Sequence, residues 1–166
     1  MPRPRGPLLA LLAGVALAVA GCGFQLRGTA SLPFDTIAVP VETPLGTALQ
    51  RNIDAGTNAK VVPQNENPEA ILSILGETRE KLILSLNAQG RVREYELRYI
   101  VSFRAFAPKG GEYIPTDTIA LARAITFNDQ VLAKEAEEEI LYAEMRSDMV
   151  QLIMRRLAAA KLVKPE

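Results

Sequence analysis

The chain contains no histidine, no tryptophan and a single cysteine. The commonest general base and the commonest zinc or iron ligand are therefore missing. A glycine-rich phosphate loop, a nucleophile elbow and an acidic calcium loop are missing from the sequence as well. The composition does not exclude catalysis by a serine–lysine pair or by paired carboxylates, but no motif in the sequence indicates either. We therefore expect a non-catalytic binding or assembly protein, without a metal or a bound cofactor.

The chain also has no excess of charge of either sign. Its 19 basic side chains balance its 19 acidic ones, and loss of an N-terminal segment with Arg3 and Arg5 would leave a slight acidic excess. A nucleic-acid partner is not expected from this balance, because binding to the phosphate backbone needs a basic domain or a basic stripe. Any anionic partner must meet a local patch of cations.

An apolar run near the start carries the most informative motif of the sequence. A basic beginning precedes an apolar segment from Leu8 to Ala20, which suits a secretory signal and is short for a permanent membrane span. Val19-Ala20-Gly21-Cys22 closes this segment with small residues and then the only cysteine. This arrangement predicts a lipoprotein signal peptide over residues 1–21, which is removed from the mature protein.

Cys22 is predicted to become the lipidated N-terminus, carrying an S-diacylglycerol and an N-acyl group. The alternative is an ordinary signal peptide cut near Ala20, which would leave a lone reactive thiol on an exported domain. Two or three acyl chains hold a protein stably on a membrane, whereas one chain holds it only marginally. Residues 22–34 would then form a tether, and residues 35–166 a single domain.

Hydrophobic periodicity divides residues 35–166 into six elements. The clearest is an alternation of apolar residues from Tyr95 to Ala105, typical of a half-buried antiparallel strand. Thr43 and Pro44 suit a helix start, Gly76 a bulge, and Pro115 an edge strand. The expected strands are Asp35–Val41, Ala70–Leu86, Val92–Ala107 and Tyr113–Phe127, and the expected helices are Thr43–Gly56 and Asn128–Leu162.

The order β-α-β-β-β-α predicts an α+β fold. We expect a two-layer sandwich in which two helices lie on one face of a four-stranded sheet. The acidic run from Glu135 to Glu139 fits the start of a helix better than a metal site. One set of apolar residues should form the buried stripe of the last helix: Leu141, Met145, Met149, Leu152 and Leu157. A second set, of small residues, should meet a close neighbour: Ala120, Ala122 and Ala124.

Several stretches taken together resemble one family. They are Cys22-Gly23-Phe24-Gln25-Leu26-Arg27-Gly28, the strand around Tyr95 to Phe103, Ala124-Ile125-Thr126-Phe127-Asn128-Asp129 with Val131-Leu132-Ala133-Lys134-Glu135, Leu141-x-x-x-Met145-Arg146, and Arg155-Arg156-Leu157. In order and spacing they are similar to the LptE family of LPS-assembly lipoproteins, over the whole mature chain.

This resemblance implies the same α+β sandwich and a place on the periplasmic side of the cell outer membrane, held by the lipid anchor. It implies that the protein partners the LptD β-barrel as a plug, supports assembly of that barrel, and helps deliver lipopolysaccharide to the outer leaflet. Gly23, where some inner-membrane lipoproteins have aspartate, fits outer-membrane sorting. The alternative function is another periplasmic scaffold lipoprotein, such as an accessory subunit of barrel assembly.

Three cations are candidates for contact with lipopolysaccharide. If the three long strands form a meander, the turn at residues 87–90 lies at the end where the last strand finishes and the last helix starts. Arg91, Arg93 and Lys134 would then gather at that end and could bind the phosphates of lipid A. Lys134 also lies within the stretch that resembles the family. The alternative is an ordinary solvated hairpin tip.

Overall fold

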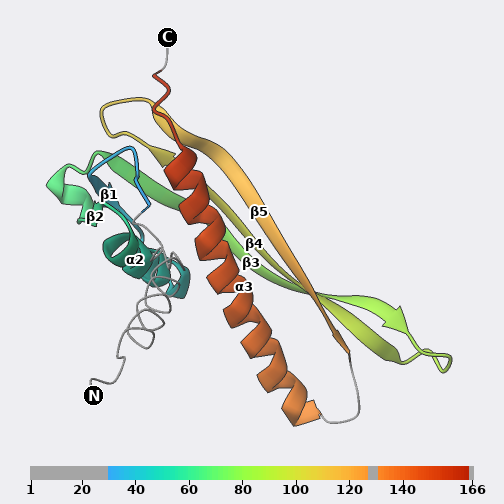
Figure 1. Ribbon diagram of the computed structural model, residues 1–166. Helices are drawn as coiled ribbons and strands as arrows, with labels where there is room; N and C mark the ends of the chain where they lie inside the picture. Colours follow the sequence, from blue (N-terminus) through green and yellow to red (C-terminus); the bar gives the residue numbers. More distant parts are fainter. Residues whose placement is uncertain (1–29, 127–130, 165–166) are drawn as a thin grey trace, which may run out of the picture.

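The computed structural model describes residues 30–126 and 131–164, and the side chains of residues 131–134 lie outside the description. Two main helices and a twisted sheet make up the fold (Figure 1). In chain order the elements are β1 (Thr36–Ala38), α2 (Pro44–Gly56), β2 (Lys60–Val61), the 3-10 helix η1 (Gln64–Glu66), β3 (Ala70–Leu86), β4 (Val92–Phe106), β5 (Glu112–Thr126) and α3 (Val131–Ala159).

The sheet has five strands in the order β2-β1-β3-β4-β5, so the expectation of four strands was wrong. The additional strand, β2, contains only Lys60 and Val61, and it pairs in parallel with β1. Two residues are too few to show a period of two, which is why the sequence pattern missed this strand. β1 also pairs in parallel with β3, whereas β3, β4 and β5 form the expected antiparallel meander. The α+β class and the two helices are confirmed.

The first helix begins and packs as its sequence predicts. Thr43 adopts an extended conformation, and its hydroxyl oxygen accepts a hydrogen bond from the Gly46 amide at 3.0 Å. This bond satisfies one of the free amides of the first turn. Leu45, Leu49 and Ile53, which are spaced four residues apart, are fully buried. α2 therefore packs one apolar face into the core.

The alternation of buried residues along β4 shows which face of the sheet the helices cover. Leu97, Tyr99, Val101 and Phe103 are fully buried on the face that carries both helices (Figure 1). Pairing of β3 with β4 shifts register between Ile74 and Gly76, which confirms the predicted irregularity there. Pro115 does lie in an edge strand, β5. The bounds of the three long strands are close to those expected, whereas β1 is shorter than the expected Asp35–Val41.

The face of β5 that carries small residues has no packing neighbour among the described residues, because both helices lie on the opposite side of the sheet. The expectation of a close neighbour was therefore wrong. The residues concerned, all exposed, are Ala120, Ala122 and Ala124. The start of β5 is instead covered at its edge by the C-terminal segment, where the Val163 amide donates to the Glu112 carbonyl at 2.8 Å.

The last helix, α3, buries a stripe with a strict spacing of four residues. The stripe consists of Met145, Met149, Ile153 and Leu157, all fully buried. The expected stripe had Leu152 in place of Ile153, and Leu152 is only partly buried. The i+4 rows of a helix point in nearly one direction, so Ile153 continues the row that Met145 and Met149 begin. The expected helix start at residue 128 lies outside the described residues.

Candidate functional site

The β3–β4 hairpin carries apolar side chains that the fold leaves in water. They lie at its far end, beyond the part of the sheet that the helices cover (Figure 1). The exposed fractions are 42% for Leu82, 61% for Ile83, 51% for Leu84 and 56% for Leu86. Clusters of exposed apolar residues are uncommon on soluble proteins and mark surfaces that bind a protein or a lipid.

Consecutive apolar residues place apolar side chains on both faces of this hairpin end. Leu82 lies opposite Glu96 and Ile83 opposite Tyr95, and neighbouring residues of a strand point to opposite faces. The register between β3 and β4 shifts between Ile83 and Ser85 and again between Ser85 and Leu86.

Arg91 and Arg93 follow the turn at the tip of the same hairpin. The Asn87 side-chain oxygen accepts hydrogen bonds from the Gln89 and Arg91 amides at 3.0 and 2.9 Å, and Gly90 has a φ of 74°. Both arginine side chains are exposed, and neither forms an ion pair within the described parts of the chain. The exposed leucines and these cations therefore occupy one hairpin end.

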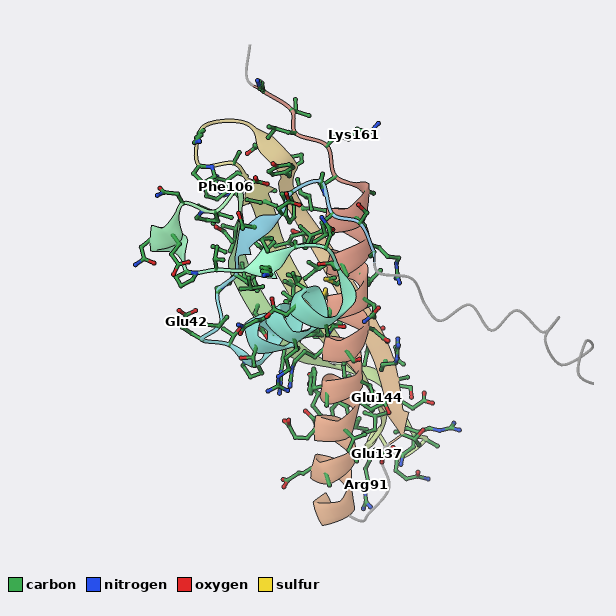
Figure 2. The ribbon with its side chains drawn as sticks, turned by 60° about the vertical axis from the view of Figure 1, so that its left-hand side comes forward. Glu42, Arg91, Phe106, Glu137, Glu144 and Lys161 are labelled. Carbon is green, nitrogen blue, oxygen red and sulfur yellow. The ribbon has the colours of Figure 1, made fainter. Side chains whose placement is uncertain are left out.

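The topology brings the three predicted cations to one end of the sheet. Glu94, next to Arg93, pairs with Thr126, the last residue of β5, and α3 starts at Val131. Figure 2 shows Arg91 at the end of the molecule where α3 begins, with Lys161 at the opposite end. The Lys134 side chain is outside the description, so its contact with the arginines stays a prediction.

A polar layer joins β3 to the first half of α3. Lys81 Nζ donates to Glu138 Oε2 at 2.5 Å, and this hydrogen bond raises the pKa of Lys81. Arg79 pairs with Glu139 at 3.3 Å, and its guanidinium lies 4.7 Å from the centre of the Tyr142 ring. The acidic run of α3 thus has a structural use, because two of its carboxylates fix the helix to the sheet. No group of three possible metal ligands occurs among the residues described.

A buried tyrosine completes this layer. The Tyr99 hydroxyl donates to Glu77 Oε1 at 2.6 Å. Burial, reinforced by the neighbouring carboxylate, raises the pKa of Tyr99 far above its usual value. The Tyr142 hydroxyl donates to the Glu80 carbonyl at 2.9 Å. Polar contacts with β3 therefore add to the packing of Tyr142 at this end of α3.

Comparison with known proteins now identifies the family. The sequence model of the LptE family, described as lipopolysaccharide-assembly, matches residues 29–157. The LPS-assembly lipoprotein LptE of Yersinia enterocolitica is 34% identical over 164 residues, which cover 92% of this chain and 76% of the relative. The chain belongs to the LptE family. Its predicted resemblance is therefore confirmed.

Solved structures agree with this assignment. The solution structure of an uncharacterised lipoprotein B from Nitrosomonas europaea is 43% identical, with a TM-score of 0.71, covering 82% of this chain and 91% of that one. The crystal structure of the rare lipoprotein B from Shewanella oneidensis is 27% identical, with a TM-score of 0.64, covering 75% and 92%. The α+β sandwich is thus shared with experimentally solved lipoproteins.

Membership in the LptE family gives the chain a role in lipopolysaccharide assembly as a lipoprotein, and the family description names no catalytic activity. The predicted signal peptide and Cys22 lie outside the described residues. Of the helices in the described parts, none is both long enough and apolar enough to cross a membrane.

Proposed function

We propose that this LptE-family chain is a non-catalytic outer-membrane lipoprotein, anchored through Cys22 on the periplasmic side, that partners and plugs the LptD β-barrel. In this role it supports assembly of the barrel and delivery of lipopolysaccharide to the outer leaflet. The observation that carries the proposal is the family match over residues 29–157. Residues 1–21 act as the signal, residues 22–34 as the lipidated segment and residues 35–166 as the single domain that meets the barrel. The end of the lipidated segment is part of the packed fold, because Leu32 and Phe34 are buried in the core.

The uncovered face of the sheet supports the plug role. On this face Ser102 and Thr118 share a hydrogen bond at 2.8 Å, and the Arg104 guanidinium lies 4.7 Å from the centre of the Phe106 ring. Ala120, Ala122 and Ala124 of β5 add small, exposed side chains to this face. The lumen of an outer-membrane barrel is polar, so its wall can offer partners to the hydroxyl and guanidinium groups of this face.

Depletion and co-purification test the partnership. The lipidated chain, extracted in a mild detergent, should retain LptD in a one-to-one complex. Depletion of the chain should lower the amount of folded LptD and of surface lipopolysaccharide. Recovery of a different barrel would instead favour the alternative, an accessory lipoprotein of barrel assembly. Normal LptD and lipopolysaccharide levels after depletion would refute the proposal.

The hairpin end is the proposed contact for lipopolysaccharide. Lipid A combines phosphates with acyl chains, and the hairpin combines Arg91 and Arg93 with exposed leucines. Lys134, in the first turns of α3, is the third proposed cation. Cations form charge-assisted hydrogen bonds with phosphates, and exposed apolar side chains gain about 25 cal/mol for each Å² that they bury. The surface therefore matches both parts of the ligand.

Charge reversal tests this contact. Changing Arg91, Arg93 and Lys134 together to Glu should weaken lipopolysaccharide binding while leaving folding and barrel association intact, because the two arginines are exposed and form no ion pair with the described residues. Three exposed lysines away from this hairpin end provide a control with equal charge change: Lys60, Lys109 and Lys161. Unchanged lipopolysaccharide binding by the folded triple variant would refute this contact, and the protein would keep only its structural role as a plug.

Intact-mass analysis tests the anchor. Protein isolated from membranes should begin at Cys22 and carry the mass of its acyl chains. A free thiol at Cys22 in membrane-derived protein would disprove lipidation, and it would leave the lipopolysaccharide contact to be judged on its own.

A further inference from the structure

A pocket lies between α2 and α3. These two helices cover one face of the sheet, away from the tip of the β3–β4 hairpin (Figure 1). The volume of the pocket is about 370 Å³. Thr47, Arg51 and Asn52 line it from α2, and Arg146 and Ser147 line it from α3. The pocket thus combines two arginines with hydroxyl and amide groups, and no carboxylate is among its lining residues.

Most of the neutral polar groups in this pocket are already used. The Thr47 hydroxyl donates to the carbonyls of Val41 or Thr43 at 3.0 or 3.1 Å. Asn52 donates to the Ala48 carbonyl at 2.9 Å and accepts from Gln151 at 3.2 Å. These bonds fix the walls of the pocket, and they leave the two guanidinium groups as its main donors.

The two arginines have no acidic partner within the described residues. The Arg146 Nε atom is buried and forms no hydrogen bond there, and Arg51 is exposed and forms no ion pair in the described parts. Asp148, close to Arg146 in sequence, is occupied by Arg123 at 2.8 Å. A buried donor without a partner is unfavourable by about 1 to 3 kcal/mol, so an acceptor that reaches the Arg146 guanidinium would be stabilising.

We propose that this pocket binds a phosphate group. A guanidinium presents several donors in a fixed fork that matches an oxyanion. A tetrahedral phosphate carries oxygens on more than one side, so it can accept from Arg51 on α2 and from Arg146 on α3 together. A carboxylate carries only two oxygens, so it offers fewer acceptor positions to two facing guanidinium groups than a phosphate does. The phosphate would also join the two helices that cover the sheet.

Titration with two phosphate probes tests the site. The lipidated chain in a nonionic detergent is titrated with inorganic phosphate and, separately, with phosphatidic acid in the same micelles, and heat release gives the affinities. Arg51→Gln and Arg146→Gln should each weaken binding by about tenfold, since each removes a charge-assisted hydrogen bond. Arg155→Gln, on the same helix but outside the pocket, should bind as the unchanged protein does.

The two probes separate the possible sources of the phosphate. Tighter binding of phosphatidic acid identifies a lipid headgroup, and tighter binding of inorganic phosphate identifies a free anion. Saturable binding of neither probe, or equal affinities in all variants, overturns the site. Circular dichroism confirms folding, and because Arg51 is exposed, its variant decides the question even if Arg146→Gln unfolds. The experiment uses the chain without the LptD barrel, so its outcome is independent of the proposed partnership.

Discussion

Replacing the exposed leucines of the hairpin end should separate ligand binding from folding. Leu84 and Leu86 are 51% and 56% exposed in the folded chain. Because about half of each side chain is already in water, the double change Leu84→Ser and Leu86→Ser should reduce the free energy of unfolding by no more than about 1 kcal/mol. The fold should therefore survive, with a melting curve close to that of the unchanged protein.

The expected effect on lipopolysaccharide affinity is larger. Complete burial of a leucine is favourable by roughly 1.5 to 3 kcal/mol, so burying the exposed half on binding contributes about 1 kcal/mol for each residue. Loss of both contributions, about 2 kcal/mol, weakens binding and raises the dissociation constant roughly 30-fold. Binding of labelled lipopolysaccharide to the purified chain, followed by fluorescence polarisation, measures this change.

A control with similar exposure keeps this test specific. Leu75 and Val163 are 53% and 68% exposed and lie away from the hairpin end. Their double change to Ser removes a comparable exposed apolar area, and it should leave lipopolysaccharide affinity unchanged. An affinity of the folded Leu84→Ser, Leu86→Ser variant equal to that of the control would refute the acyl-chain contact, and the cations alone would remain.

Two further predictions concern the core. Gly46→Ala should lower the free energy of unfolding by about 3 kcal/mol, because the new Cβ would lie 1.6 Å from the Pro40 carbonyl oxygen; thermal melting measures this, and Gly56→Ala, which meets no atom within 4 Å, should not destabilise the chain. The pKa of Tyr99 is raised in the folded state, so its contribution to stability is complete below the unfolded pKa near 10 and is lost as the pH rises above it. In the Tyr99→Phe variant the free energy of unfolding should therefore fall less steeply between about pH 10 and 12. Thermal melting at several alkaline pH values measures this, and an unchanged dependence on pH would show that Tyr99 does not cause the loss.

Local signals account for the parts of the fold that the sequence predicted well. The Thr43 cap, the four-residue spacing in α2 and the alternation of β4 all act between near neighbours in the chain. Each can be read from residue types because its physical cause lies within a few residues. The lipoprotein motif ending at Cys22 is likewise local, and the family resemblance was recognised from short stretches in a fixed order.

Signals that depend on tertiary context were missed. β2 exists because two residues, Lys60 and Val61, lie beside β1, and two residues carry no period of their own. The end of the β3–β4 hairpin is exposed because the helices do not extend over it, which alternation along a strand cannot show. The α2–α3 pocket joins Arg51 to Arg146 across a large separation in sequence, and no spacing rule connects such residues.

The two ends of α3 are held by different forces, and this difference shapes how the protein can work. Met145, Met149 and Leu157 fix the later turns by apolar burial, whereas Glu138 and Glu139 fix the earlier turns through ion pairs with β3. These ion pairs are partly exposed, and exposed pairs contribute about 0 to 1 kcal/mol each. The end of the sheet that carries the proposed ligand contacts is thus weakly held compared with the core. Substitutions there can change binding while the apolar end keeps the domain folded.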